Sequence, residues 1–585
     1  MNTKPHLFNN SYSISSIGAE NISNLFADKY NNLYNSVPYD VSKMADIDDQ
    51  LENLVQSKCK TGQCPISHVV TVDEVICCVN LLKSNKSDGN EGLLSNHIIN
   101  GSTLLYDNIA MLCTAMIYHG YASPNLRLST VIPIVKNKKK SLNDSGNYRG
   151  IALSSILSKL LDIIIIQKHN VQLRSSEFQF GFKEKSSTVN CTFVADEIIN
   201  YYCNNDSYVY ATYLDASKAF DRVRFDRLFQ LLIERNVCPS IARLLSFLYT
   251  NQQCRIRWCG NISHNININN GVKQGGVLSP ILFNVYLDVL LLRLEQSGHG
   301  CHVGNMYAGC LGYADDVLLL SPTRQTLTNM LQVCEDYSVD FNIEFNASKS
   351  KLIVFGKNPI RANVSFQGEV ISQVDSEKHV GNIMSNCSDI IAQRVSQACN
   401  SLTAQFNLLM RNFGFCSPNI LYRLFHTYCM SLYGCQLWDF SKESLMETVY
   451  VKWRKCVRRI YNLPYKTHCN LLHLVANDSS ILVQLHRRFL TSFIKMHRSK
   501  NLLVALMSKV ALNGSRSFSS NSLTYICAKY NICKYELSKR DIKKVSDSDS
   551  EDTVLRASIL SDFLEYRGIP YDQDLSDIIE HLCTS

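Results

Sequence analysis

Three aspartates carry the clearest chemical signal in this sequence. Asp315 and Asp316 lie between two short apolar runs, a pattern that predicts a hairpin with the acids at its tip. Taken alone, a solvated turn explains this pair equally well. Asp215, however, ends a strand-like run (VYATYL, 209–214), and a fold that brings it beside the pair would create a site of hard oxygen ligands. Two magnesium ions about 3.5–4 Å apart in such a site can activate an attacking hydroxyl and stabilise a leaving oxygen, which is the chemistry of nucleotidyl transfer.

The hydrophobic pattern predicts strands and helices that could position these acids. Strands are expected at 131–135, 209–214 and 352–355. Helices are expected at 22–34, 225–234 and 279–294, and from Thr71 through Val75, Val79 and Leu82. Beyond about residue 390 the pattern becomes helical and more basic. The mixture predicts an α+β fold.

The order of motifs around the acids makes this interpretation specific. DASKAFD (215–221), GVKQGGVLSPILFNVYLD (271–288) and YADD (313–316) follow one another along the chain. Together they resemble the palm of a reverse transcriptase, and most of all that of a non-LTR (LINE-type) retrotransposon. The resemblance implies that Asp215, Asp315 and Asp316 are catalytic and hold the metal ions, with Ala216 offering a backbone carbonyl to one of them.

The same resemblance implies a nucleotide site beside the acids. Phe220 falls where the family carries an aromatic residue under the incoming sugar, which would exclude a 2′-hydroxyl; a core aromatic residue is the alternative. Gln274 and Gly275 match a loop that contacts the incoming nucleotide and the template strand. Lys136 and Arg149 match basic positions that meet triphosphate oxygens, where arginine can grip phosphate by two bonds and lysine acts as a point charge.

Three further segments resemble family motifs. Lys349, in FNASKSKLIVFG (345–356), matches a lysine that protonates departing pyrophosphate, a contribution typically worth about 10²–10⁴-fold. A surface lysine is the alternative reading. FQFGFKEKSSTVN (178–190) resembles a motif that lies along the template. Residues 379–381 fall at a primer-gripping hairpin, where Val380 replaces the usual aromatic residue or leucine.

The region 433–468 resembles the thumb of non-LTR enzymes. At helical spacing, one face of its second part carries Trp453, Val457 and Ile460, and another carries Lys452, Lys455 and Arg459. An apolar face for packing and a basic face for phosphates would suit a helix laid against a nucleic-acid duplex. A solvated basic surface is the alternative.

Composition restricts the class of protein further. The chain has 585 residues, of which 45% are hydrophobic and 19% charged, as in an ordinary globular protein with a sizeable core. A net charge of +8 permits nucleic-acid binding without establishing it. The N-terminus lacks the apolar segment of a signal peptide, and no apolar run approaches the roughly 20 residues that span a bilayer. A nuclear or cytoplasmic protein without membrane partners is expected.

The cysteines predict reduced thiols and no zinc site. There are 23 of them, scattered along the chain. Cys59 and Cys64 have no matched pair nearby in the sequence, and Cys527 and Cys533 are too widely spaced for a zinc ribbon. His581 and Cys583 are isolated.

The resemblance implies an α+β right-hand polymerase with fingers, a palm built on an antiparallel sheet and a helical thumb. The expected divisions are an N-terminal extension or linker (1–70), fingers and palm (71–360), a primer-grip region and thumb (361–480), and a C-terminal helical region with an acidic linker at 546–552 (481–585).

The predicted activity is that of an RNA-directed DNA polymerase, a nucleotidyltransferase that extends a primer 3′-hydroxyl with dNTPs. The expected partners are an RNA template and a DNA primer, and the expected cofactors are two Mg²⁺ ions, with Mn²⁺ as a substitute. Because full elements of the family carry an endonuclease domain, a truncated retrotransposon product is expected, with the endonuclease missing or supplied by another chain. Two alternatives stay open: an inactive relic that binds RNA, and an RNA-dependent RNA polymerase.

Overall fold

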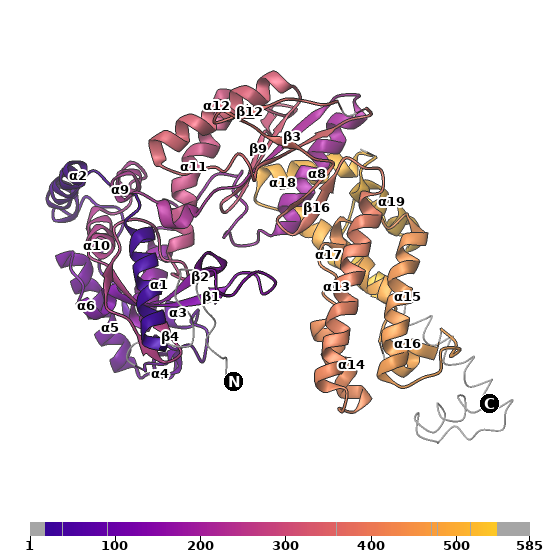
Figure 1. Cartoon of the computed structure of the whole chain (residues 1–585), viewed down its shortest axis with the longest axis horizontal. Coiled ribbons are helices and arrows are strands. Elements are labelled where there is room, and N and C mark those ends of the chain that lie inside the picture. Colours follow the sequence, from indigo (N-terminus) through magenta and orange to yellow (C-terminus); the bar gives the residue numbers. More distant parts are fainter. Residues whose placement is uncertain are drawn as a thin grey trace.

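The computed structural model describes residues 18–546, apart from residues 38, 90, 91, 359, 470, 477 and 515. Most of the acidic stretch 546–552, together with His581 and Cys583, lies outside the described residues. The ribbon forms an arch: a first sheet with its helices stands on one side of a second sheet, and a group of C-terminal helices stands on the other (Figure 1).

The first sheet joins strands that are far apart in the sequence. Its order is β2-β1-β4-β5, with β6 also on β4; β1 is antiparallel to β2 and parallel to β4. The strands are β1 (Leu128–Val135), β2 (Tyr148–Leu153), β4 (Gln253–Trp258), β5 (Asn261–Ile262) and β6 (Ile266–Asn267). The helices of this part of the chain are α1 (Ala19–Tyr34), α2 (Val41–Leu54), α3 (Val72–Val79), α4 (Ser95–Ile99), α5 (Thr103–His119), α6 (Pro124–Arg127), α7 (Ile156–Lys168), α9 (Phe225–Glu234) and α10 (Pro239–Thr250).

The N-terminal helices belong to this unit: within the expected N-terminal extension or linker (1–70), residues 19–34 and 41–59 are helical and pack on the first sheet and its helices. Helix α1 confirms the helical pattern predicted there, and it packs on β4. The Phe26 ring is fully buried, with its centroid 5.2 Å from the rings of both Tyr148 and Trp258. Helix α2 and the π-helical turn that follows it (Val55–Cys59) pack on α10. Burial of these apolar faces fixes the segment to the first sheet and its helices.

The second sheet has the order β14-β11-β3-β10-β9. Its strands are β3 (Val209–Leu214), β9 (Cys310–Tyr313), β10 (Asp316–Ser321), β11 (Lys351–Phe355) and β14 (Ser372–Gln373). All six residues of β3 are buried, and β3 is antiparallel to both β10 and β11. The helices α8 (Thr188–Asn204), α11 (Ser279–Ser297) and α12 (Arg324–Phe341) flank this sheet. The predicted strands at 209–214 and 352–355 are confirmed.

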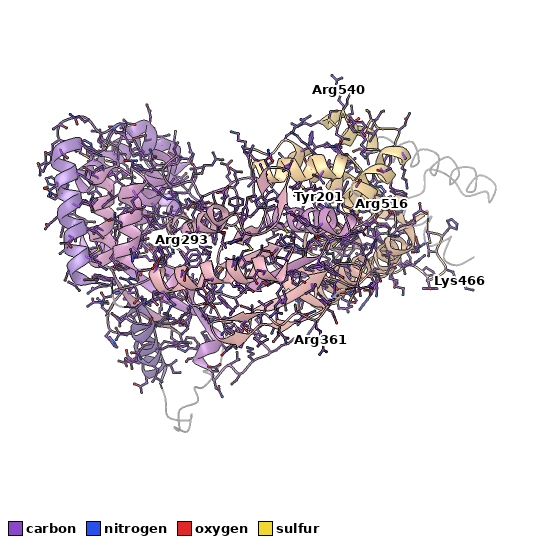
Figure 2. All side chains as sticks on the ribbon, turned by 90° about the horizontal axis from the view of Figure 1, so that it is seen from above. Tyr201, Arg293, Arg361, Lys466, Arg516 and Arg540 are labelled. Carbon is purple, nitrogen blue, oxygen red and sulfur yellow. The ribbon has the colours of Figure 1, made fainter. Side chains whose placement is uncertain are left out.

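Short strand pairs and the C-terminal helices complete the chain. The pairs are β7 (His302–Val303) with β8 (Met306–Tyr307), β12 (Ser365–Phe366) with β13 (Glu369–Val370), and β15 (Ser376–His379) with β16 (Asn382–Ser385). The helices are α13 (Ile390–Phe413), α14 (Pro418–Tyr428), α15 (Glu443–Ile460), α16 (Leu471–Ala476), α17 (Ile481–His497), α18 (Leu502–Leu512) and α19 (Phe518–Lys529). Seen from above, Tyr201 of α8 and Arg516, just before α19, both lie in the half of the molecule that holds the C-terminal helices (Figure 2).

A buried ion pair joins the C-terminal helices to α8. The Arg394 guanidinium of α13 donates two hydrogen bonds to the Asp196 carboxylate of α8, at 2.7 and 3.0 Å, and both side chains are less than a tenth exposed. Arg394 Nε also donates to the Ile383 carbonyl oxygen of β16 at 2.8 Å. One side chain therefore holds α8, α13 and the β15–β16 hairpin together.

Local sequence signals explain several element boundaries. Thr71 and Glu74 form a capping box at the start of α3, as the predicted helix start requires, but the helix ends at Val79 and does not reach Leu82. Helix α11 begins at Ser279 with Pro280 in its first turn, where a missing N–H costs nothing. Among the described residues, no helix is both long and apolar enough to cross a bilayer.

The fold brings a third cysteine to the two N-terminal ones. Cys59 and Cys64 have no partner nearby in the sequence, but in the structure Cys238 lies beside them, and the three sulfurs are all within 4.8 Å of one another. Sequence spacing could not reveal this neighbour because 179 positions separate Cys59 from Cys238.

Candidate active site

The acidic pair lies at the tip of the β9–β10 hairpin. Tyr313 pairs with Asp316, so Ala314 and Asp315 form a two-residue turn. Ala314 has φ of 57°, a left-handed conformation that costs a residue with a side chain about 1–2 kcal/mol. The turn therefore needs support from outside the hairpin.

Gln179 and Gly181 supply that support. The Ala314 N–H donates to Gln179 Oε1 at 2.9 Å, and the same oxygen accepts from the Gly181 N–H at 2.8 Å. Gln179 is fully buried. A Cβ on Gly181 would lie 2.3 Å from the Ala314 nitrogen, so only glycine allows the turn to come this close.

The segment 178–182 thus has a structural task that its sequence resemblance did not suggest. The Phe180 N–H donates to the Gly312 carbonyl oxygen at 2.7 Å, and the Gly312 N–H donates to the Phe178 carbonyl oxygen at 2.8 Å. The segment runs beside β9 as an additional short parallel pairing. The prediction that 178–190 lies along a template stays a prediction; what the structure shows is that its first residues hold the acidic turn.

Asp215 is brought to the same edge of the second sheet. It directly follows β3, whose last residue, Leu214, is opposite Val317 of β10, the residue after Asp316. On its other side the Asn346 N–H donates to the Asp215 carbonyl oxygen at 2.8 Å, and the Ser217 N–H donates to the Glu344 carbonyl oxygen at 2.8 Å. Ala216, between them, is bridged to Phe345. The three predicted acids therefore converge, although 100 positions separate Asp215 from Asp315 (315 − 215).

The electrostatics show that these carboxylates repel one another. Burial raises the pKa of Asp315 above its ordinary value; Asp215 adds to the rise, while Arg149 opposes it. Partial burial, followed by the charges of Asp315 and Asp215, raises the pKa of Asp316 to about 6. Like charges that crowd together in this way favour a bound cation.

Lys349 is the charged neighbour of Asp215. Its Nζ lies 3.5 Å from Asp215 Oδ2, and both side chains are substantially exposed, at 64% and 44%. An ion pair this exposed contributes at most about 1 kcal/mol, so it can exchange its partner readily. The structure thus places the predicted general acid next to the predicted metal ligands.

The nucleotide-site residues meet on the side of the acids that faces the first sheet. The Val272 N–H donates to the Phe220 carbonyl oxygen at 2.8 Å, which joins the segment of Phe220 to the loop of Gln274. The half-buried Phe220 ring stacks on Phe283, with centroids 4.3 Å apart. Gly275 has φ of +107°, and a Cβ there would lie 2.8 Å from the Ala152 carbonyl oxygen of β2.

Asp221 is a central residue of this region that the sequence interpretation did not single out. It is 4% exposed, and Gln274 Nε2 donates to its two carboxylate oxygens at 2.8 and 2.9 Å. Burial raises the pKa of Asp221 to about 6, while Gln274, Lys218, Lys136 and Arg149 act in the opposite direction. The only sequence signal was its place at the end of DASKAFD, seven residues that begin with a catalytic candidate.

Lys218, Lys136 and Arg149 interact with Asp221, and Lys29 lies near Lys136 and Lys218. We call these four cations the basic cluster. Burial and then Lys136 lower the pKa of Lys29 to about 8, while burial and then Arg149 lower that of Lys136. Lys136 and Arg149 were predicted from sequence; Lys29 and Lys218 were not. Lys29 comes from α1, more than 100 positions before the other three, and only the packing of α1 on the first sheet brings it here.

The predicted nucleic-acid residues of α15 lie outside this site. Figure 1 shows α15 among the C-terminal helices, on the far side of the arch from the first sheet. Trp453, Val457 and Ile460 are buried, so the predicted apolar face is confirmed. Lys455 and Arg459 are exposed and Lys452 is half-buried. Arg459 donates to Asn407 Oδ1 of α13 at 3.1 Å, so part of this basic face is turned toward the neighbouring helix.

The expected hairpin at 379–381 is confirmed as β15–β16. Val380 and Gly381 form its turn, with φ of 39° and 91°. The Tyr433 hydroxyl donates to the Val380 carbonyl oxygen at 2.8 Å and lies 2.6 Å from the Thr188 hydroxyl of α8. Tyr433, from a distant segment, therefore places an aromatic side chain against this turn, where the hairpin's own residue is Val380.

Comparison with known proteins agrees with this geometry. Residues 136–383 match the family described as reverse transcriptase (RNA-dependent DNA polymerase). The chain is 22% identical over 459 residues to the probable RNA-directed DNA polymerase from transposon BS of Drosophila melanogaster, covering 74% of this chain and 49% of that protein. It is 26% identical over 333 residues to the RNA-directed DNA polymerase from mobile element jockey of Drosophila funebris, covering 54% and 35%.

Among solved structures, the apo telomerase of Candida tropicalis, truncated from its C-terminal domain, aligns with a TM-score of 0.31 and 15% identity, covering 48% of this chain and 60% of that one. The chain spans less than half the length of the two Drosophila relatives. The match at 136–383 includes every acid, Phe220, Gln274 and Lys349. Residues 136–383 therefore form a reverse transcriptase domain of the RNA-directed DNA polymerase family, a family of nucleotidyltransferases, and the chain is related to the polymerases of non-LTR retrotransposons.

Proposed function

We propose that this chain copies an RNA template into DNA, extending a primer 3′-hydroxyl with deoxynucleoside triphosphates. The observation that supports this most directly is the convergence of Asp215, Asp315 and Asp316 at one edge of the second sheet, with the basic cluster on the side of the first sheet. A nucleotidyl-transfer site needs carboxylates that can hold metal ions, next to basic side chains that can hold a triphosphate.

The donor set fits magnesium. Asp215, Asp315, Asp316 and the Ala216 carbonyl offer hard oxygens. Burial, and after it the repulsion between the carboxylates, raises the pKa values of Asp315 and Asp316, and divalent cations would offset both effects. Among the described residues, Asp315 and Asp316 form no ion pair with a basic side chain, so their oxygens stay available. When bound, two Mg²⁺ ions, or Mn²⁺ in their place, would activate the primer hydroxyl and stabilise the charge on the phosphate.

The other predicted site residues would bind the triphosphate, orient the sugar and protonate the departing pyrophosphate. The basic cluster would hold the β- and γ-phosphates, because burial and mutual repulsion among its members favour an incoming anion. Lys349, beside Asp215, would donate its proton to the departing pyrophosphate. The Phe220 ring, fixed by its stack on Phe283, would lie beneath the sugar and exclude a 2′-hydroxyl.

The arch suggests a right-hand assignment. The first sheet with α1–α7, α9 and α10 would be the fingers, and the second sheet with α8, α11 and α12 would be the palm. Helices α13–α15 would form the thumb, with Lys452, Lys455 and Arg459 on a face for the template–primer duplex. The β15–β16 hairpin, held by Arg394 and Tyr433, would position the primer end.

Primer extension tests the proposal. The full chain would be given an RNA template, a DNA primer, dNTPs and Mg²⁺, and Asp315→Asn would be compared with wild type. We expect wild type to extend the primer and the variant to lose at least about 10³-fold in rate, since removal of one triad acid in other enzymes costs on that order. Asp206→Asn is the matched control, because Asp206 is exposed and precedes the opposite end of β3.

The same assay separates the two alternatives. An RNA-dependent RNA polymerase would use rNTPs in preference to dNTPs, whereas stacked Phe220 predicts preference for dNTPs. An inactive relic would bind the template–primer and extend it no faster than Asp315→Asn. Extension that survives Asp315→Asn would exclude the proposed site.

A further inference from the structure

Three cysteines form a cluster among the helices that accompany the first sheet. Cys59 ends the π-helical turn after α2, Cys64 follows in the next loop, and Cys238 directly precedes α10. Their sulfurs all lie within 4.8 Å of one another. Among the residues that the structure describes, this is the one such group of cysteines, histidines or acids within that spacing.

The spacing of the sulfurs suits a tetrahedral metal ion. Zinc holds thiolates at about 2.3 Å in a tetrahedron, which places neighbouring sulfurs about 3.8 Å apart. Cys59 Sγ and Cys238 Sγ are 3.8 Å apart. A disulfide would require a separation of about 2.0 Å, so the pair is positioned as two separate thiols.

Two features of the surroundings act in opposite directions on a thiolate at Cys238: the start of a helix and burial. Cys238 occupies the N-cap of α10, where the partial positive charge of a twelve-residue helix stabilises an anion. Burial raises the pKa of the metal-free Cys238 thiol to about 12, and the Ile241 N–H acts in the opposite direction.

Access and backbone geometry agree with a binding site. Cys59 and Cys238 are buried, at 5% and 1% exposure, whereas Cys64 is half-buried and forms the open side of the cluster. The 59–64 loop folds back on the π-helical turn: the N–H groups of Gln63 and Cys64 both donate to the Lys58 carbonyl oxygen, at 2.9 and 3.0 Å. This return brings Cys64 toward Cys59, and the packing of the π-helical turn on α10 adds Cys238.

We propose that Cys59, Cys64 and Cys238 bind one zinc ion as thiolates. A solvent molecule would occupy the fourth coordination position, on the open side of the cluster next to Cys64. Binding releases the three thiol protons to solvent and changes no oxidation state. The ion would clamp the end of α2 to the start of α10, and so fix the N-terminal helices to the part of the chain that holds the reverse transcriptase domain.

The test measures zinc in the purified full chain. Wild type, prepared with zinc and dialysed without chelator, is expected to hold about one zinc per chain by mass spectrometry of the metal. Cys64→Ser, at the half-buried position, is expected to retain about tenfold less or lower. Cobalt substituted for zinc should give the intense sulfur-to-metal absorption of thiolate ligands in wild type alone.

A matched control separates metal loss from misfolding. Cys113→Ser replaces another buried cysteine, on α5, which lies outside the cluster, and should keep the zinc of wild type. Excess zinc should also raise the melting temperature of wild type but not of Cys64→Ser. Zinc content in Cys64→Ser equal to that of wild type, or a wild type with no zinc, would overturn the proposal, and neither result depends on polymerase activity.

Discussion

Replacing Gln179 by methionine should slow primer extension although residue 179 touches no predicted substrate. Methionine matches glutamine in length but can accept no hydrogen bond of comparable strength from a backbone N–H. The change therefore removes the acceptor that Gln179 Oε1 offers to Ala314, at 2.9 Å, and to Gly181, at 2.8 Å.

The size of the effect follows from those two contacts. Each buried N–H left without a partner costs about 1–3 kcal/mol, and the left-handed Ala314 stores about 1–2 kcal/mol that the turn can release by moving. Misplacement of Asp315 and Asp316 would weaken stabilisation of the transition state. If about 1.4–3 kcal/mol of this energy is lost there, kcat falls about 10- to 100-fold. The remainder should lower the urea midpoint of unfolding.

The assay is single-turnover extension of a DNA primer on an RNA template, with the unfolding midpoint measured in parallel. Gln252→Met is the matched control: Gln252 is 1% exposed, and neither side-chain polar atom has a hydrogen-bond partner among the described residues. That substitution should leave kcat unchanged and raise stability, because a buried unpaired amide is removed.

One result would refute the reasoning about the turn. If Gln179→Met extends the primer within about twofold of Gln252→Met, the hydrogen bonds to the Ala314 turn do not set the position of the acids. Slower extension with an unchanged KM for dNTP is the expected signature, because the change lies behind the acids and away from the basic cluster.

Three other substitutions test separate parts of the site. Gly181→Ala places a Cβ 2.3 Å from the Ala314 nitrogen, so single-turnover extension should fall by about 10²-fold while circular dichroism stays that of the folded chain. Phe220→Val shortens the proposed sugar barrier, and competition between rNTPs and dNTPs should show at least about tenfold more rNTP incorporation; an unchanged ratio would make Phe220 a core residue only. Asp221→Asn tests the buried carboxyl whose folded pKa is about 6. Folded Asp221 holds its proton over a pH range in which the unfolded residue has lost it. Its contribution to the unfolding free energy should therefore fall as pH rises from about 4 to 6, by on the order of 3 kcal/mol, and urea titrations should show this fall as the difference between the wild-type and variant profiles.

Local patterns predicted much of the fold. The strand-like run at 209–214 and the apolar runs around the acidic pair predicted three strands of the second sheet, since each reflects burial along a single element. The motif order also identified Asp215, Asp315 and Asp316 before their convergence was visible.

Contacts between distant segments could not be predicted in this way. Lys29 reaches the basic cluster only because Phe26 and its neighbours fix α1 to the first sheet. Gln179 supports the acidic turn from 135 positions away, and no periodicity in the sequence indicates such a pairing. The helical pattern at 22–34 was visible in the sequence, but the sheet on which this helix packs is formed by later residues and could not be predicted from it.

The Arg394–Asp196 ion pair has a consequence for how such chains can be recombined. Asp196 lies inside the matched stretch 136–383, whereas Arg394 lies eleven residues beyond its end (394 − 383). A chimaera joined at that boundary to a foreign C-terminal region would inherit a buried carboxylate without its guanidinium, a loss of about 3–5 kcal/mol. The unit that can be exchanged between relatives therefore extends into α13, beyond residue 383, where the family match ends.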